Sequence, residues 1–301
     1  MQGDEGLDFL TQRIASAVKE AWQNRKPAMY ANEFGRAAVG MCRRACYSDG
    51  SAKMWGNTDT ASFISLEGGN DSGIELIYTF DENKNPTGVI ENIACPSQVV
   101  EQRSFISSDF WGKVKILLRE KFGKDFFVLC LCGAGGDQCP RDLIRWVEPE
   151  TPINDPNVVR DNVTLRKADP SMYDIAGTWK IGKRIGREIV DVYDEMPIDD
   201  IKSEATFIHK KITLDLPLRR VTPKEYELAC KTISDYVEKN DNFSFADNAA
   251  MHVHAGTISR YKQQEEVDIY PTEVHIVRLG DIAFATNAFE MFLDYRKRGV
   301  K

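Results

Sequence analysis

The spacing of apolar side chains predicts both helices and strands along the chain. Leu10, Ile14 and Val18 recur at helical intervals, so about Leu7–Gln23 is expected to form an amphipathic helix. The segment SSDFWGKVKILLREKFG shows the same periodicity, from an N-cap at Ser108 to Gly123. A further helix is expected at Met172–Met196. Another should follow the capping box formed by Thr222, Pro223 and Glu225. Two more are expected around Ala246–Tyr261 and in the last segment, FEMFLDYRKR.

Shorter apolar or alternating segments predict strands between these helices. Ile74–Phe80 and Gly88–Ala94 flank the turn-rich DENKNP, which indicates a hairpin. Asp125–Cys132 is a continuous apolar run, typical of a strand buried in a sheet. Other strands are expected at Met29–Phe34, at Ala205–Leu216 and in the hairpin EVHIVRLGDIAFAT, which turns on Gly280–Asp281.

Two segments have no clear periodicity of either kind. Ala38–Thr60 is rich in Gly, Asn, Asp and Thr and is expected to be a long irregular loop, and Arg141–Val147 is expected to form one or two helical turns. Together the elements predict an α/β fold, with a mixed β-sheet core flanked by helices in a single large domain. Its expected first and second parts are residues 1–150 and 151–301, with the Pro- and Asn-rich Glu148–Asn162 as the linker candidate.

Composition narrows the class of protein. The 301 residues are 42% hydrophobic and 28% charged, which is typical of a soluble globular protein. A net charge of -7 argues against a nucleic-acid partner, because phosphate binding needs a basic surface. The apolar runs are too short for a transmembrane segment. The first ten residues, MQGDEGLDFL, have neither the basic region nor the apolar region of a signal peptide. A small-molecule or lipid substrate is the expected partner.

The stretch FVLCLCGAGGDQCPRDLIRW carries the strongest chemical signal. Its glycines let the backbone turn sharply at the end of a strand, so the N–H groups of Gly135 and Gly136 could bind an anion or an oxyanion. Cys139 is a candidate nucleophile, because a helix N-terminus and Arg141 would favour its thiolate. Asp137 could orient a loop amide or act as a base. The alternative is a structural glycine turn with a buried cysteine and an Arg–Asp surface pair.

Four stretches, in order, resemble motifs of the neutral, non-lysosomal ceramidases. GDQCP resembles the family's GDVSP, and GMCRRACYSDG resembles its NRR…Y loop. GVIENIACPSQVV…FISSDFWGKV resembles the strand, HGTS turn and ISSDxxG helix start, and VHIVRLGDIAFATNAFEMF resembles RIGDLAIVALPGEF. The resemblance implies a zinc-dependent hydrolase that cleaves the amide bond of an N-acyl lipid.

Carried over to this sequence, the resemblance implies roles for three residues. Cys139 falls where the family has its nucleophilic serine, Arg43 matches the arginine that binds the substrate carbonyl, and Glu290 matches a zinc-binding glutamate. Cys95 stands where the family has a metal histidine in its HGTS turn and is the second candidate ligand. The other metal histidine and the tyrosine have no counterpart, so the chain is expected to be incomplete at both ends or to lack the metal.

Three hypotheses therefore follow from the sequence. The first is a ceramidase-like amide hydrolase, and the second is a binding or interaction domain that keeps the scaffold without the metal. The third is a metal-free cysteine amidase in which His252 or His254 acts as the base; these two histidines share a face only if their segment is extended. His209 and His275 are expected to face solvent or a neighbouring strand.

Overall fold

The computed structural model divides the chain into two compact units, which are described separately. Unit 1 comprises Met1–Ala205 with Glu290–Lys301, and unit 2 comprises Thr206–Phe289. The structure describes residues 3–101, 103–146, 168–169, 172, 174–239 and 245–295. The expected linker Glu148–Asn162 lies outside the described residues. The expected division into residues 1–150 and 151–301 stays a prediction.

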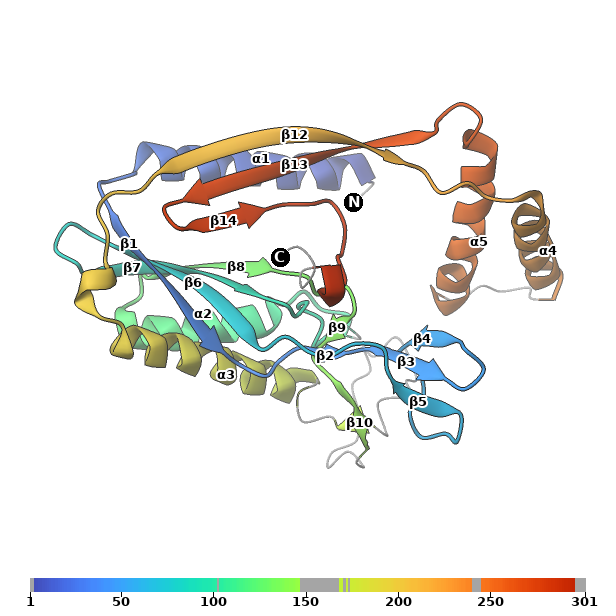
Figure 1. Cartoon of the computed structure of the whole chain (residues 1–301), viewed down its shortest axis with the longest axis horizontal. Coiled ribbons are helices and arrows are strands. Elements are labelled where there is room, and N and C mark those ends of the chain that lie inside the picture. The colour runs from blue at the N-terminus through green and yellow to red at the C-terminus, as the bar shows by residue number, and fades with distance from the viewer. Residues whose placement is uncertain are drawn as a thin grey trace. The chain divides into compact units, whose positions relative to one another are not determined.

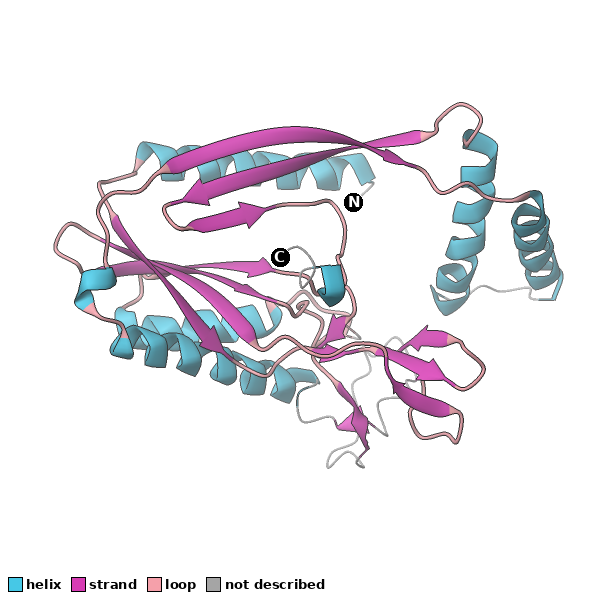
Figure 2. Ribbon diagram, in the orientation of Figure 1, coloured by secondary structure: helices cyan, strands magenta, loops and turns pink. Residues whose placement is uncertain are grey.

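Unit 1 is built around a mixed four-stranded sheet in the order β1-β6-β7-β8 (Figure 1). β1 (Met29–Arg36), β6 (Gly73–Phe80) and β7 (Pro86–Ile93) are antiparallel neighbours, and β8 (Phe127–Cys132) runs parallel to β7. The parallel step is possible because α2 (Asp109–Phe122) connects β7 to β8. The predicted α/β fold with a mixed sheet flanked by helices is therefore confirmed (Figure 2).

One face of this sheet packs against α2 and α3 (Asp174–Glu195) and forms the core of unit 1. Alternate residues of β6, including Ile74, Leu76 and Tyr78, point into this core, as the period of two in a strand requires. The Tyr78 hydroxyl donates a hydrogen bond to the Ile189 carbonyl oxygen of α3 at 2.5 Å. The two helices approach closely at Gly182, where a Cβ atom would meet Lys113 of α2.

The remaining strands of unit 1 are short and correct two predictions. Ala38–Thr60 is not an irregular loop, since it contains β2 (Met41–Cys42), β3 (Arg44–Tyr47) and β4 (Ala52–Met54). Within the predicted helical turns Arg141–Val147, the described residues 141–146 are not helical: β10 (Asp142–Trp146) is a strand paired with β11 (Ala168–Asp169). These strands are too short to show a clear periodicity, and β2 and β10 have pairing partners that are distant in sequence. β2 pairs with β9 (Gln138–Cys139), and β3 pairs with β4 and β5 (Phe63–Leu66).

Several predicted elements of unit 1 are confirmed and one is corrected. α1 (Gly3–Gln23), the β6–β7 hairpin and α3 all form where the pattern predicts them, and η3 (Ile198–Asp200) is a short 3-10 helix. β8 lies at the edge of the sheet and is not buried on both faces, since its Phe127 and Leu129 side chains are 43% and 49% exposed. A continuous apolar run therefore does not by itself place a strand in the middle of a sheet.

Unit 2 contains an antiparallel three-stranded sheet and two helices. The sheet has the order β12-β13-β14, with β12 (Phe207–Pro217), β13 (Ile269–Leu279) and β14 (Ile282–Ala285). The hairpin turns at Gly280, whose φ of 60° explains the glycine. The predicted capping box precedes α4 (Pro223–Lys239): Thr222 N donates to Glu225 Oε2 at 2.8 Å, and Glu225 N donates to Thr222 Oγ1 at 3.3 Å.

Candidate functional site

The glycine loop after β8 packs directly against the C-terminal segment of unit 1. Gly136 N donates a hydrogen bond to the Met291 carbonyl oxygen at 2.9 Å. A Cβ atom on Gly136 would overlap the carbonyl oxygen of Glu290, so only glycine fits here. Gly135 is close to the Cys132 sulfur, and its N–H has no hydrogen-bond partner among the described residues. The Gly136 amide is therefore occupied, whereas the amide of the buried Gly135 is unpaired among the described residues.

Arg43 lies where three separate segments meet. Its Nη2 atom donates a hydrogen bond to the Gly136 carbonyl oxygen at 2.8 Å and lies 3.9 Å from Glu290 Oε2. The Arg43 side chain is 13% exposed, and its Nε atom is buried without a hydrogen-bond partner among the described residues. A buried guanidinium N–H without an acceptor is unfavourable, so this donor is suited to a ligand oxygen. The structure thus brings Arg43, Gly136 and Glu290 together.

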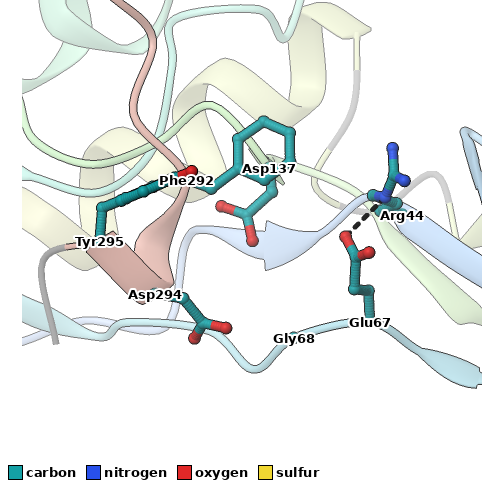
Figure 3. Close-up of a pocket in the computed structure, with 7 residues that line it drawn as sticks. All are labelled: Arg44, Glu67, Gly68, Asp137, Phe292, Asp294 and Tyr295. Carbon is teal, nitrogen blue, oxygen red and sulfur yellow. Dashed lines mark ion pairs between the residues drawn. The ribbon is translucent and has the colours of Figure 1, made fainter. Parts of the chain in front are cut away.

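Asp137 faces a pocket at the same place. Its Oδ1 atom accepts a hydrogen bond from Leu293 N at 2.9 Å, and its backbone carbonyl accepts one from Arg43 N at 2.8 Å. Only 5% of Asp137 is exposed. The pocket has a volume of about 320 Å³ and belongs entirely to unit 1. Its lining consists of Arg44, Glu67, Gly68, Asp137, Phe292, Asp294 and Tyr295 (Figure 3).

Cys139 is close in sequence to this pocket but does not line it. The residue is completely buried on β9, and its thiol donates a hydrogen bond to the Arg141 carbonyl oxygen at 3.2 Å. Burial raises the pKa of Cys139 to about 12, although the guanidinium groups of Arg141 and Arg43 oppose the shift. The expected helix N-terminus is absent because β10 follows, so the local field does not offset this desolvation. At neutral pH the thiol of Cys139 is therefore protonated.

The zinc-ligand set implied by the resemblance does not fit the described residues. The Glu290 carboxylate lies beside the Arg43 guanidinium, and its side chain is 84% exposed. Cys95 is buried, its thiol donates hydrogen bonds to the carbonyl oxygens of Val39 and Pro96, and burial raises its pKa. Within the described ranges, no three His, Cys, Asp or Glu side chains come together in a way that could hold a metal ion. No chemical step is therefore assigned to zinc.

The four histidines and Cys139 belong to different compact units. All four lie between residues 206 and 289, in unit 2. His252 and His254 are in α5 (Phe245–Gln263), where residues two apart point to different sides. His209 Nε2 and His275 Nδ1 lie 2.8 Å apart across β12 and β13, so these two histidines face a neighbouring strand.

Sequence patterns did not identify most of the pocket lining. Arg44 on β3 and Glu67, which directly follows β5, form an ion pair with Nε and Oε2 2.6 Å apart. Phe292 and Asp294 belong to the segment expected to be a closing helix, and the described helical part begins only at residue 293. The one available signal was the proximity of these residues to Glu290 in the final motif, which pointed to the segment but not to these side chains.

Arg43 and Arg141 both lie near the ring of the partly buried Trp55. The Arg141 guanidinium carbon lies 4.8 Å from the centre of the Trp55 ring, and that of Arg43 lies 5.9 Å from it. Trp55 adopts a φ of 56°, an uncommon backbone conformation for a bulky residue. The stacking fixes both guanidinium groups near the glycine loop.

Comparisons with known proteins give two distant structural similarities. No protein-family model matches the chain, and no curated protein sequence matches it. The neutral ceramidase from Pseudomonas aeruginosa is similar at 12% identity and a TM-score of 0.48, over 90% of this chain and 42% of that chain. A ceramidase complexed with C2 is similar at 10% identity and a TM-score of 0.45, over 86% of this chain and 41% of that chain.

The chain spans less than half the length of either ceramidase chain. None of the described helices has both the length and the apolar character needed to cross a membrane.

Proposed function

We propose that this chain is a ceramidase-like domain that binds an N-acyl lipid at the Arg43 site and hydrolyses its amide bond. The observation that supports the proposal is the convergence of Arg43, Gly136 and Glu290. Their motifs are separated by more than ninety residues in the chain, yet Arg43 Nη2 lies 2.8 Å from Gly136 O and 3.9 Å from Glu290 Oε2. Independent motif matches would not be expected to meet at one point by chance.

In this proposal the amide carbonyl oxygen accepts hydrogen bonds from Arg43 Nε and Gly135 N. Both donors lack a partner among the described residues. Donors directed at the carbonyl oxygen stabilise the negative charge that develops when a nucleophile attacks the carbonyl carbon. The Cys139 sulfur would form a thioester with the acyl carbon as the C–N bond breaks, the thiol proton passing to the departing amine, and water would then hydrolyse the thioester to the acid and restore the thiol. Zinc remains an expectation from the resemblance and has no assigned step.

A second candidate function is binding without cleavage. The observation that favours it is the state of Cys139, whose buried thiol has a pKa raised to about 12. A neutral thiol is a poor nucleophile, and attack would require that Cys139 both lose its proton and become exposed. In this case Arg43 would still bind the amide, and the bond would remain intact.

One experiment distinguishes the two functions. The full chain is incubated with a short-chain, fluorescent N-acyl sphingoid amide, with and without added Zn²⁺, and both binding and release of the amine are measured. Release that falls about a hundredfold in Arg43→Ala would support hydrolysis, because that is the usual effect of removing one such donor. Arg187→Ala is the matched control, since Arg187 is an exposed arginine on α3.

The remaining outcomes are equally informative. Saturable binding without amine release, lost in Arg43→Ala and retained in Arg187→Ala, would support the binding function. The absence of both binding and release, with or without Zn²⁺, would contradict both candidates. Release that is unchanged in Arg43→Ala would show that the amide is cleaved elsewhere.

A further inference from the structure

The pocket beside Asp137 has an unequal distribution of charge. Three carboxylates line it, those of Glu67, Asp137 and Asp294, and Arg44 is the only cationic side chain among its described lining residues. Because Arg44 is 2.6 Å from Glu67, that pair is approximately neutral. Asp294 forms no ion pair with a described residue. The pocket therefore retains the negative charges of Asp137 and Asp294 (Figure 3).

Asp137 gives this pocket more than a negative surface charge. The residue is 95% buried, and while Oδ1 accepts the Leu293 N–H, Oδ2 accepts no hydrogen bond from the described residues. The Oδ2 atom faces Gly68, where an added Cβ atom would lie 3.4 Å from it. This unpaired carboxylate oxygen opens onto the pocket that Asp137 lines, where it is available to a positively charged donor, and hydrogen bonds between ionised groups are stronger than those between neutral groups.

The other walls of the pocket are aromatic. Phe292 and Tyr295 come from the C-terminal segment and line the same cavity as Asp137. Aromatic rings attract organic cations and also accept the apolar part of a ligand. Ca²⁺ and Mg²⁺ instead require six or more oxygen ligands, and no metal-holding group of three occurs among the described side chains. The lining thus favours an organic ammonium ion over a metal ion.

We propose that this cavity binds the ammonium group of a primary alkylamine, with Asp137 Oδ2 and Asp294 as acceptors and with the alkyl chain against Phe292 and Tyr295. The inference goes beyond the proposed function because it requires no bond cleavage. If the chain does hydrolyse an N-acyl lipid, an ammonium ion is the form that the released amine takes at neutral pH, and the pocket would hold that product beside Arg43.

The test measures binding of n-hexylammonium to the full chain by titration calorimetry, with n-hexanol as the uncharged probe of the same length. We expect hexylammonium to bind and hexanol not to bind. Asp137→Asn keeps the Oδ1 acceptor for Leu293 but removes the charge, and Asp294→Asn removes a charge from an exposed residue. Each should weaken binding about tenfold, as expected for the loss of a charged hydrogen-bond partner. Asp125→Asn, at an exposed carboxylate of the same unit, should leave binding unchanged.

Four results would overturn the inference. These are no binding of hexylammonium, equal binding of hexanol, unchanged binding in both pocket variants, or displacement of hexylammonium by Mg²⁺ at matched ionic strength. The last would identify an inorganic cation site. Amide cleavage without hexylammonium binding would refute this inference and leave the proposed function intact. Hexylammonium binding without any interaction with the N-acyl amide would support this inference and contradict the proposed function.

Discussion

Glu91 provides the sharpest test of the physical interpretation of unit 1. It lies on β7 and points into the core beneath α2, where it is completely buried. Its Oε1 atom is 3.5 Å from the Cys130 sulfur, and its Oε2 atom has no hydrogen-bond partner among the described residues. Burial raises the pKa of Glu91 to about 8, and the thiol of Cys130 and the charge of Lys115 only partly oppose the shift. The carboxyl group is therefore neutral in the folded chain at pH 7.

The direction of the pH dependence follows from this shift. The ordinary pKa is 4.5, so between pH 4.5 and pH 8 the folded chain retains a proton that the unfolded chain releases. The contribution of Glu91 to the free energy of unfolding is fully present below pH 4.5 and is lost as the pH rises through the folded-state pKa of about 8. The free energy of unfolding should fall by about 1.4 kcal/mol per pH unit, or about 5 kcal/mol over the whole window.

Glu91→Gln removes the titration with little change in shape. We expect the variant to lose this slope, so that its free energy of unfolding relative to the unaltered chain rises from pH 5 to pH 8. Urea unfolding followed by circular dichroism at several pH values measures the difference. Any shift in the free energy of unfolding that the buried amide of the variant causes is the same at every pH, and such a shift leaves its dependence on pH unchanged. Glu290→Gln, at a largely exposed carboxylate, is the control. Equal slopes for Glu91→Gln and the unaltered chain would refute the reasoning.

Further predictions concern the glycine loop and its cysteines. Iodoacetamide at pH 7.5 should label the exposed Cys132 well before the buried Cys139, as measured by mass spectrometry of peptides; early labelling of Cys139 would show that its site opens. Gly136→Ala should destabilise the chain by about 1–3 kcal/mol, because the new methyl group would overlap Glu290 O. Gly256→Ala, in α5 with open space around it, should instead stabilise unit 2 by up to about 1 kcal/mol. Urea unfolding of both variants measures these effects, and equal stability changes would contradict the packing argument.

Helices and long strands could be predicted from local patterns because their signals lie within a single segment. The apolar spacing of Leu7–Gln23, the capping box at Thr222 and the turn at Gly280 each determine an element without help from distant residues. The short strands could not be predicted in this way. β2 and β10 are held by partners far along the chain, and two to five residues carry too little periodicity to reveal a strand.

The sequence by itself determined the α/β class and pointed to the glycine loop and Arg43 through motifs whose residues are contiguous. Only the tertiary structure decided how these parts meet. It brought Glu290 beside Arg43, left Asp137 facing a pocket, and buried Cys139 so that its thiol remains protonated. The reason is physical: helix periodicity and turn chemistry act between near neighbours, whereas burial, pKa shifts and ligand cavities depend on which distant segments pack together.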